Sequence, residues 1–295
     1  MTKLRTQRPV HISLWIACGA LVVLALPLWW GRAKPEPIYQ GKKVTEWIAN
    51  MKTANLEDEA GNALAAIGPQ AVPYLVRTLG NESILMKSYR EKVYLGFRQN
   101  LPGVARFLPR PSDEPYVGTR AAAAFTLGRI GPQAKAAVPA LIRAARDADL
   151  SVRMHSTQSL GLIGSAAVQA SPILIERLNE PDPLSRWIAA RALAHVGCRD
   201  TSAIPGLTAL LNSTNANFAC SAAVALWQIQ PKPERFLVMS NYLRAAPAEA
   251  AYVLGGMAER ARSALPLLKA ELQTTNETVR RAVGKAIQRI EGSRE

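Results

Sequence analysis

The sequence predicts an all-α protein in which helix pairs stack into an α-α superhelix, preceded by one transmembrane helix. Two observations predict the superhelix: a residue spacing and a proline that keeps the same register. An apolar residue recurs in steps of 33 residues, at Ile130, Ile163, Val196 and Ile229. A proline follows nine residues later in three of these copies, at Pro139, Pro172 and Pro205. The third observation is an uncharged apolar run over residues 12–30, which predicts the membrane helix.

Residues 1–11 form a basic leader that we expect on the cytoplasmic side, and residues 12–30 form a signal anchor. At 1.5 Å per residue the anchor is just long enough to cross a bilayer core of roughly 30 Å. Tryptophans near both of its ends suit the two membrane interfaces. Residues 31–40 then form a linker, stiffened by Pro35 and Pro37.

A cleaved signal peptide is the competing interpretation of the same run. Cleavage would release the repeat domain as a secreted protein, whereas an uncleaved anchor keeps it tethered as a single-pass membrane protein. In a bacterium, both interpretations place the repeat domain outside the cytoplasm.

Residues 41–295 are predicted to be the superhelix, interrupted by an insertion at 80–118. The segment from Gly41 to Trp47 predicts a turn into a capping helix, with Thr45 or Asn55 as candidate helix caps. Trp47 would cover the exposed end of the stack, because terminal repeats need such a cover.

Each recurring residue type has a mechanical role in a helix pair. An aspartate or asparagine before the first helix accepts hydrogen bonds from its first amides, as expected at Asp149, Asp182 and Asn276. Glycine after the apolar residue ends that helix. Proline fits the first turn of the second helix, where its missing N–H costs nothing. An arginine ten residues before the apolar position is expected to bond neighbouring caps and carbonyls as a ladder, at Arg120, Arg153, Arg186 and Arg280.

These residues resemble HEAT repeats, and among them the subtype named after phycobilisome lyases. The resemblance covers residues 56–79 and 117–292 and implies a binding scaffold rather than a catalyst. The fifth copy departs from the pattern, with Ala219 in place of the arginine and Gln230 in place of the glycine. The sixth copy is shorter and has Pro247 at the arginine position. We therefore expect helices with altered stacking and a bend there.

The insertion interleaves basic and aromatic residues before a proline-rich return. It predicts a projecting element that binds phosphate, acidic protein or lipid headgroups, and an amphipathic helix packed on the first repeat explains the same pattern. Its candidate partner-binding residues are Lys87, Arg90, Lys92, Tyr94, Phe97, Arg98, Arg106 and Arg110. Arg77, Arg143 and Arg177 are further candidates, because they lie on second helices, which usually line the groove of a HEAT superhelix.

The sequence contains little that indicates catalysis, so we predict no enzyme activity and no cofactor. No nucleophile elbow or phosphate-binding glycine loop is present. His195, Cys198 and Cys220 lack the paired spacing of a metal site, and we assign them no metal. The two cysteines are predicted to be packing residues, with one disulfide between them as the alternative.

The leading hypothesis is a monomeric, membrane-tethered scaffold whose groove binds another protein of unknown identity. The formal net charge of +14 suits an anionic partner, so the second hypothesis is an anion- or nucleic-acid-binding module. Nucleic acid fits poorly with an extracytoplasmic location. The third hypothesis, a bilin-lyase-like enzyme, rests on the resemblance alone.

Overall fold

The computed structural model describes residues 35–51, 58–80, 100 and 115–292. The described residues from Ile38 onward belong to one compact unit. The predicted leader, the anchor at 12–30 and nearly all of the insertion lie outside the described residues. Their predicted roles therefore stay predictions.

The described part of the repeat unit opens with a short hairpin that the sequence pattern did not predict. Strand β1 (Ile38–Tyr39) pairs antiparallel with β2 (Lys42–Lys43). The turn between them places Gln40 and Gly41 at φ values of 49° and 76°, as expected for a tight hairpin turn. A two-residue strand is too short to leave an alternating pattern in the sequence.

Helix α2 (Val44–Ala49) is the capping helix that the sequence predicted. It packs against α3 and α4, the first helix pair. Trp47 is buried, and its indole Nε1 donates to the Tyr39 carbonyl oxygen at 3.1 Å. The prediction for Thr45 was wrong, because the helix begins at Val44 and Lys43 occupies the cap position. Asn55 lies outside the described residues.

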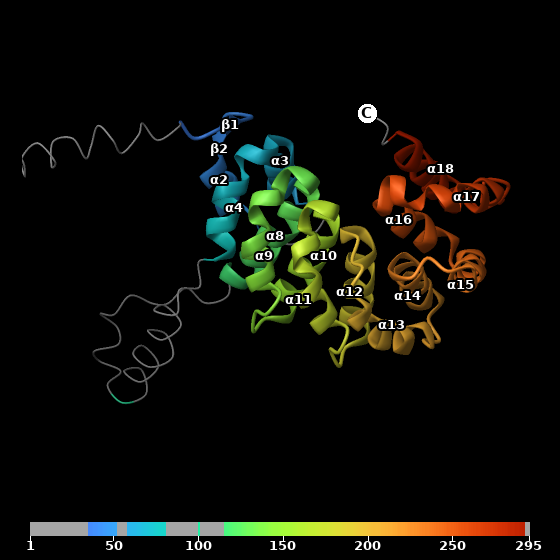
Figure 1. Cartoon of the computed structure of the whole chain (residues 1–295). Coiled ribbons are helices and arrows are strands. Elements are labelled where there is room, and N and C mark those ends of the chain that lie inside the picture. Colours follow the sequence, from blue (N-terminus) through green and yellow to red (C-terminus); the bar gives the residue numbers. More distant parts are fainter. Residues whose placement is uncertain (1–34, 52–57, 81–99, 101–114, 293–295) are drawn as a thin grey trace, which may run out of the picture. The chain divides into compact units, whose positions relative to one another are not determined.

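The rest of the unit consists of helix pairs that follow one another in chain order (Figure 1). The first helices of the pairs are α3 (Glu59–Ile67), α8 (Pro115–Ile130), α10 (Leu150–Ile163), α12 (Pro183–Val196), α14 (Ala216–Ile229), α16 (Pro247–Met257) and α18 (Glu277–Gly292). The second helices are α4 (Val72–Leu79), α9 (Val138–Ala144), α11 (Ser171–Arg177), α13 (Ile204–Leu211), α15 (Pro233–Ala245) and α17 (Leu265–Glu271). In most pairs a short 3₁₀ segment lies between the first helix and the second. These segments are η1 (Gly68–Gln70), η3 (Gly131–Ala137), η4 (Gly164–Ala170), η5 (Thr201–Ala203) and η6 (Ala258–Ala264).

The helix boundaries follow the predicted register. The recurring apolar residue is the last residue of α8, α10, α12 and α14, and the proline lies in the first turn of the second helix. Asp149 accepts from the Val152 amide at 3.0 Å, and Asp182 accepts from the Ser185 amide at 2.8 Å. These contacts confirm the predicted N-caps.

Glycines inside the first helices have a role beyond helix termination. A Cβ on Gly161 would lie 2.8 Å from the Cα of Ala192 in the next first helix, and a Cβ on Gly128 would lie 2.9 Å from the Cα of Ser159. The first helices of neighbouring pairs therefore approach so closely that a side chain does not fit. They pack on one another more extensively than the second helices do.

The expected change of stacking occurs between α14 and α16. Ala246 alone separates α15 from α16, where other copies have a longer connection. As a result α12 contacts α16, which belongs to the pair after next. The first helices thus lie on the inner side of a bend at this point.

One continuous helical stretch in the described residues, Leu150–Arg177, is long and apolar enough to span a membrane by length and composition. It comprises α10, η4 and α11, which are one repeat of the superhelix. Backbone angles at Ala167 depart from helical values, and the stretch is part of the packed core. We therefore assign it to the repeats.

Candidate functional site

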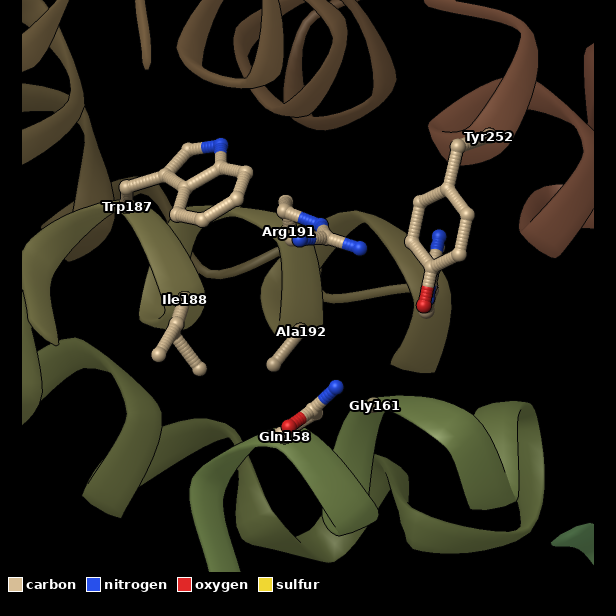
Figure 2. Close-up of a pocket in the computed structure, with 8 residues that line it drawn as sticks. Gln158, Gly161, Trp187, Ile188, Arg191, Ala192 and Tyr252 are labelled. Atoms are coloured by element: carbon tan, nitrogen blue, oxygen red, sulfur yellow. The ribbon is translucent and has the colours of Figure 1, made fainter. Parts of the chain in front are cut away.

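A pocket of about 230 Å³ lies on the first helices at the bend (Figure 2). We call it the first-helix pocket. Its walls come from α10, α12 and α16, and it is lined by Gln158, Gly161, Trp187, Ile188, Arg191, Ala192, His195 and Tyr252.

Helical spacing places the α12 side chains in this pocket. Trp187, Arg191 and His195 are four residues apart, so they lie on one face of the helix. That face is turned toward α16, which contributes Glu249 and Tyr252. The pocket therefore depends on the short connection that brings α16 back against α12.

The guanidinium of Arg191 lies between two aromatic rings. Its Cζ is 4.5 Å from the ring centroid of Trp187 and 4.0 Å from that of Tyr252. Both distances are within the range of a cation–π interaction, which is stronger when the groups are shielded from water. The two rings hold the guanidinium in one orientation.

Glu249 anchors this arrangement through a single carboxylate oxygen, Oε1. The indole Nε1 of Trp187 lies 3.2 Å from it, the hydroxyl of Ser221 2.6 Å, and Nε of Arg191 3.4 Å. Phe218 stacks on the Trp187 ring, with the centroids 5.2 Å apart. The cluster joins α12, α14 and α16.

His195 forms the buried end of the pocket. Burial lowers its pKa to about 3, and the positive charges of Arg191 and Arg260 act in the same direction. The imidazole is therefore neutral at physiological pH, and among the described residues its Nε2 has no hydrogen-bond partner. The ring packs directly against Gly256 of α16.

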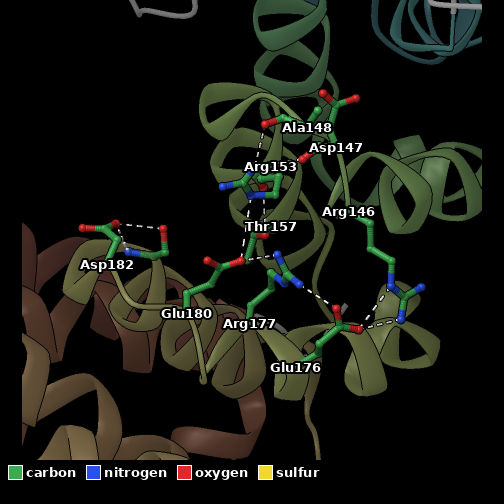
Figure 3. Close-up of polar contacts among 10 residues, drawn as sticks. Arg146, Asp147, Ala148, Arg153, Thr157, Glu176, Arg177, Glu180 and Asp182 are labelled. Atoms are coloured by element: carbon green, nitrogen blue, oxygen red, sulfur yellow. Dashed lines mark hydrogen bonds and ion pairs between the residues drawn. The ribbon is translucent and has the colours of Figure 1, made fainter.

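A second polar cluster runs along the turns that follow α9 and α11 (Figure 3). Arg146 donates to Glu176 at 2.7 Å and 3.1 Å, and Arg177 lies between Glu176 and Glu180. Because Arg146 and Glu176 are largely exposed, their pair adds about 0–1 kcal/mol to stability.

The predicted arginine ladder is present in two copies. Arg120 reaches the Leu79 carbonyl oxygen at 3.4 Å and pairs with Asp147. Arg153 donates to the carbonyl oxygens of Asp147 and Ala148, at 2.8 Å and 2.9 Å (Figure 3). Arg280 departs from the ladder, because it pairs with Glu277 of its own helix.

The predicted partner-binding residues are not brought together in the part that the structure describes. Arg77 and Arg143 are exposed on two second helices, and Arg177 is held in the cluster of Figure 3. The other predicted residues lie outside the described part: Lys87, Arg90, Lys92, Tyr94, Phe97, Arg98, Arg106 and Arg110. Partner binding by these eleven residues stays a prediction.

The first-helix pocket differs from the expected location, because first helices line it. A second pocket of about 220 Å³ is lined partly by the second helices α4 and α9 and includes the predicted Arg143, so the expectation that second helices line a groove stays a prediction. Sequence reasoning missed Trp187, Arg191 and Tyr252. The signal in the sequence was the row of large side chains at 187, 191 and 195, spaced to lie on one face of a helix.

Cys198 and Cys220 are buried free thiols, which supports their predicted packing role. Burial raises the pKa of Cys220 to about 12, and the Glu249 carboxylate adds to this effect, so the thiol stays protonated. In the described segments, no cluster of three histidine, cysteine or acidic side chains could hold a metal ion.

The fold defines an α-helical repeat protein built of stacked helix pairs. Residues 106–171 match the HEAT repeats family, and with the register described above this identifies HEAT-like repeats in the chain. No curated protein shows significant sequence similarity to it.

Several solved structures are similar in fold. One is the complex of CpcE and CpcF of phycocyanin lyase from Nostoc sp. PCC7120, with 21% identity and a TM-score of 0.49 over 88% of this chain and 99% of that chain. An engineered protein has 20% identity and a TM-score of 0.39, over 84% and 96% of the two chains. A designed armadillo repeat protein in complex with the peptide (KR)4 has 14% identity and a TM-score of 0.37, over 84% and 100%.

Proposed function

We propose that this protein is a membrane-tethered, non-enzymatic scaffold that binds another protein through the first-helix pocket and the groove around it. The observation that carries the proposal is the cluster of Trp187, Arg191 and Tyr252 at the pocket. Tryptophan, tyrosine and arginine are the residues that most often dominate the energy of protein interfaces. Here they are held rigid before binding, which lowers the entropy lost on association.

Photo-crosslinking tests this proposal directly. A benzophenone amino acid at position 158, on the pocket wall, is expected to yield a discrete crosslinked protein in intact membranes. The same amino acid at position 208, exposed on the second helix α13, serves as the matched control and is expected to yield none. Equal crosslinking from both positions, or none from either, would contradict a protein-binding pocket.

We propose further that the repeats lie outside the cytoplasm, with residues 12–30 as an uncleaved anchor. The length and flanking charges of that run support this topology. An alkaline phosphatase fused to the C-terminus is expected to be active and to sediment with membranes. An inactive fusion would reverse the topology, and an active fusion released into the soluble fraction would indicate cleavage.

A further inference from the structure

We infer that the first-helix pocket receives a carboxylate from an aspartate or glutamate side chain of the partner protein, with Arg191 as its receptor. This inference rests on the proposed function and adds the chemistry of the segment that binds. It is carried by the way in which the other contacts of Arg191 leave one edge of its guanidinium available.

Two aromatic rings take up much of the space around the guanidinium. The ring centroids of Trp187 and Tyr252 lie 4.5 Å and 4.0 Å from Cζ of Arg191. In its plane a guanidinium presents a rigid fork of N–H donors, which matches the two oxygens of a carboxylate. Figure 2 shows Arg191 between the two rings, with the Gln158 amide near the same pocket.

The Nε edge of that plane is occupied, because Nε faces Glu249 at 3.4 Å. That carboxylate oxygen is shared with Trp187 and Ser221, which holds it on its own side of the cluster. Within residues 35–51, 58–80 and 115–292, no hydrogen bond from the terminal nitrogens of Arg191 is found. Their donors therefore remain for a ligand at the pocket.

The surroundings strengthen such a contact. The Arg191 side chain is only 16% exposed, and attraction between charges rises as water is excluded. His195 at the buried end is neutral, so Arg191 is the charged group among the residues that line the pocket. The volume of about 230 Å³ equals several water molecules of roughly 30 Å³ each, which is room for one side chain rather than a helix. The chain after residue 34 carries a formal net charge of +9, which draws in acidic segments.

A peptide titration tests the inference on the full chain in detergent. The probe is a fluorescein-labelled hexaglutamate peptide, followed by fluorescence anisotropy, with hexaglutamine as the neutral control. We expect hexaglutamate to bind and Arg191→Gln to weaken it about ten-fold or more, as loss of a charge-assisted fork should. Arg191→Lys, which keeps the charge but loses the planar fork, is expected to weaken it several-fold.

The matched control is Arg244→Gln, which removes the same charge from an exposed position on α15. It should change the affinity by less than about two-fold, because general attraction is screened by salt. Gln158→Glu provides a variant that leaves the Arg191 cluster intact. It places a competing carboxylate on the pocket wall and is expected to abolish hexaglutamate binding while the helix content is kept.

An effect of Arg191→Gln no larger than that of Arg244→Gln would overturn the inference in favour of general charge attraction. Succinate that binds as tightly as hexaglutamate would assign the pocket to a small carboxylate and would also overturn it. These results are distinguishable from failure of the proposed function. If position 158 still crosslinks a protein while Arg191→Gln leaves the affinity for hexaglutamate unchanged, the scaffold proposal stands and the carboxylate inference fails.

Discussion

Gly256 is the point at which α16 lies against the imidazole of His195. A Cβ at this position would overlap Nε2 of His195, so the buried ring would have to move. Overpacking of this kind costs typically about 1–3 kcal/mol. Gly256→Ala is therefore expected to lower the free energy of unfolding by about that amount, measured by urea denaturation of the full chain in detergent.

Gly284 is the matched control for this substitution, because it lies inside α18 and a methyl group added there would meet nothing within 4 Å. Alanine there should stabilise the helix by about 0.5–1 kcal/mol through its better helix propensity. If Gly256→Ala and Gly284→Ala changed the free energy of unfolding in the same direction, the close approach of α16 to α12 would be contradicted.

His195 makes stability depend on pH in a defined direction. Its folded pKa is about 3, against an ordinary value of 6.5, so above pH 6.5 both states are neutral and it has no effect. Below pH 6.5 the unfolded chain binds a proton that the folded chain does not, and stability falls as the pH is lowered toward 3. The expected loss is about 1.4 kcal/mol per pH unit once the unfolded histidine is protonated.

The measurement is the free energy of unfolding between about pH 6.5 and pH 5, above the range in which carboxylates titrate. His195→Gln should reduce the slope of the unfolding free energy against pH by nearly 1.4 kcal/mol per pH unit, the value for one proton. This holds whatever the substitution does to stability at neutral pH. Burial also lowers the pKa of His155, so His155→Gln is the comparison and should leave the His195 contribution in place. An unchanged slope in His195→Gln would refute the assignment.

At the scale of the element, the fifth and sixth copies differ from the others at the link between first and second helix, where they have Gln230 and Ala258 in place of glycine. Gly131, Gly164 and Gly197 begin this link with φ values of 70°, 73° and 82°. The sixth copy has Ala258 there, at φ 51° and ψ −130°. This region of backbone conformation is nearly restricted to glycine, and a side chain there costs about 1–3 kcal/mol.

Ala258→Gly is therefore expected to raise the free energy of unfolding by about 1 kcal/mol, which is unusual for a substitution to glycine. Ala209→Gly provides the opposite case, because Ala209 is exposed within α13 and has no such strain. Ala209→Gly should lower the free energy of unfolding by about 0.5–1 kcal/mol. Urea denaturation of both variants checks the sign, and a loss in Ala258→Gly would show that the link is relaxed.

The helices could be predicted from sequence because each is specified locally. Asp149, Ile163 and Pro172 mark the start and end of α10 and the start of α11 by capping, termination and proline chemistry, and the structure confirms all three. The hairpin at β1 and β2 could not be predicted, since its strands are two residues long. The close-approach role of Gly161 was also missed, because it depends on Ala192 in another helix.

At the scale of the whole repeat unit, the pocket depends on a contact that no local pattern specifies. Trp187 and Glu249 are 62 residues apart, and they meet because Ala246 alone joins α15 to α16. The sequence indicated a bend from the shorter sixth copy, but the bend alone does not say which side chains it brings together. The residues at 187, 191 and 252 can be recognised as one site only when the contact between α12 and α16 is known.

Arg260 holds the same bend at its other end. It lies in η6 and donates to the carbonyl oxygens of Ala194 and His195, the last turn of α12, and at 2.9 Å to the side-chain oxygen of Gln228 on α14. It thereby satisfies helix-end carbonyls that would otherwise lack a partner. One side chain thus connects three consecutive copies.

Arg260→Met should remove these bonds while keeping much of the side-chain volume, at a cost of about 1–3 kcal/mol. Because the copies of a superhelix are stabilised mainly by their neighbours, the loss should be local. Hydrogen exchange is expected to accelerate in α16, α17 and α18 and to stay unchanged in α8 and α10. Arg262→Met, on the same segment but in an exposed pair with Glu259, should leave both regions protected. Uniform acceleration across all helices in Arg260→Met would instead mean that the bend and the N-terminal copies unfold as one cooperative unit.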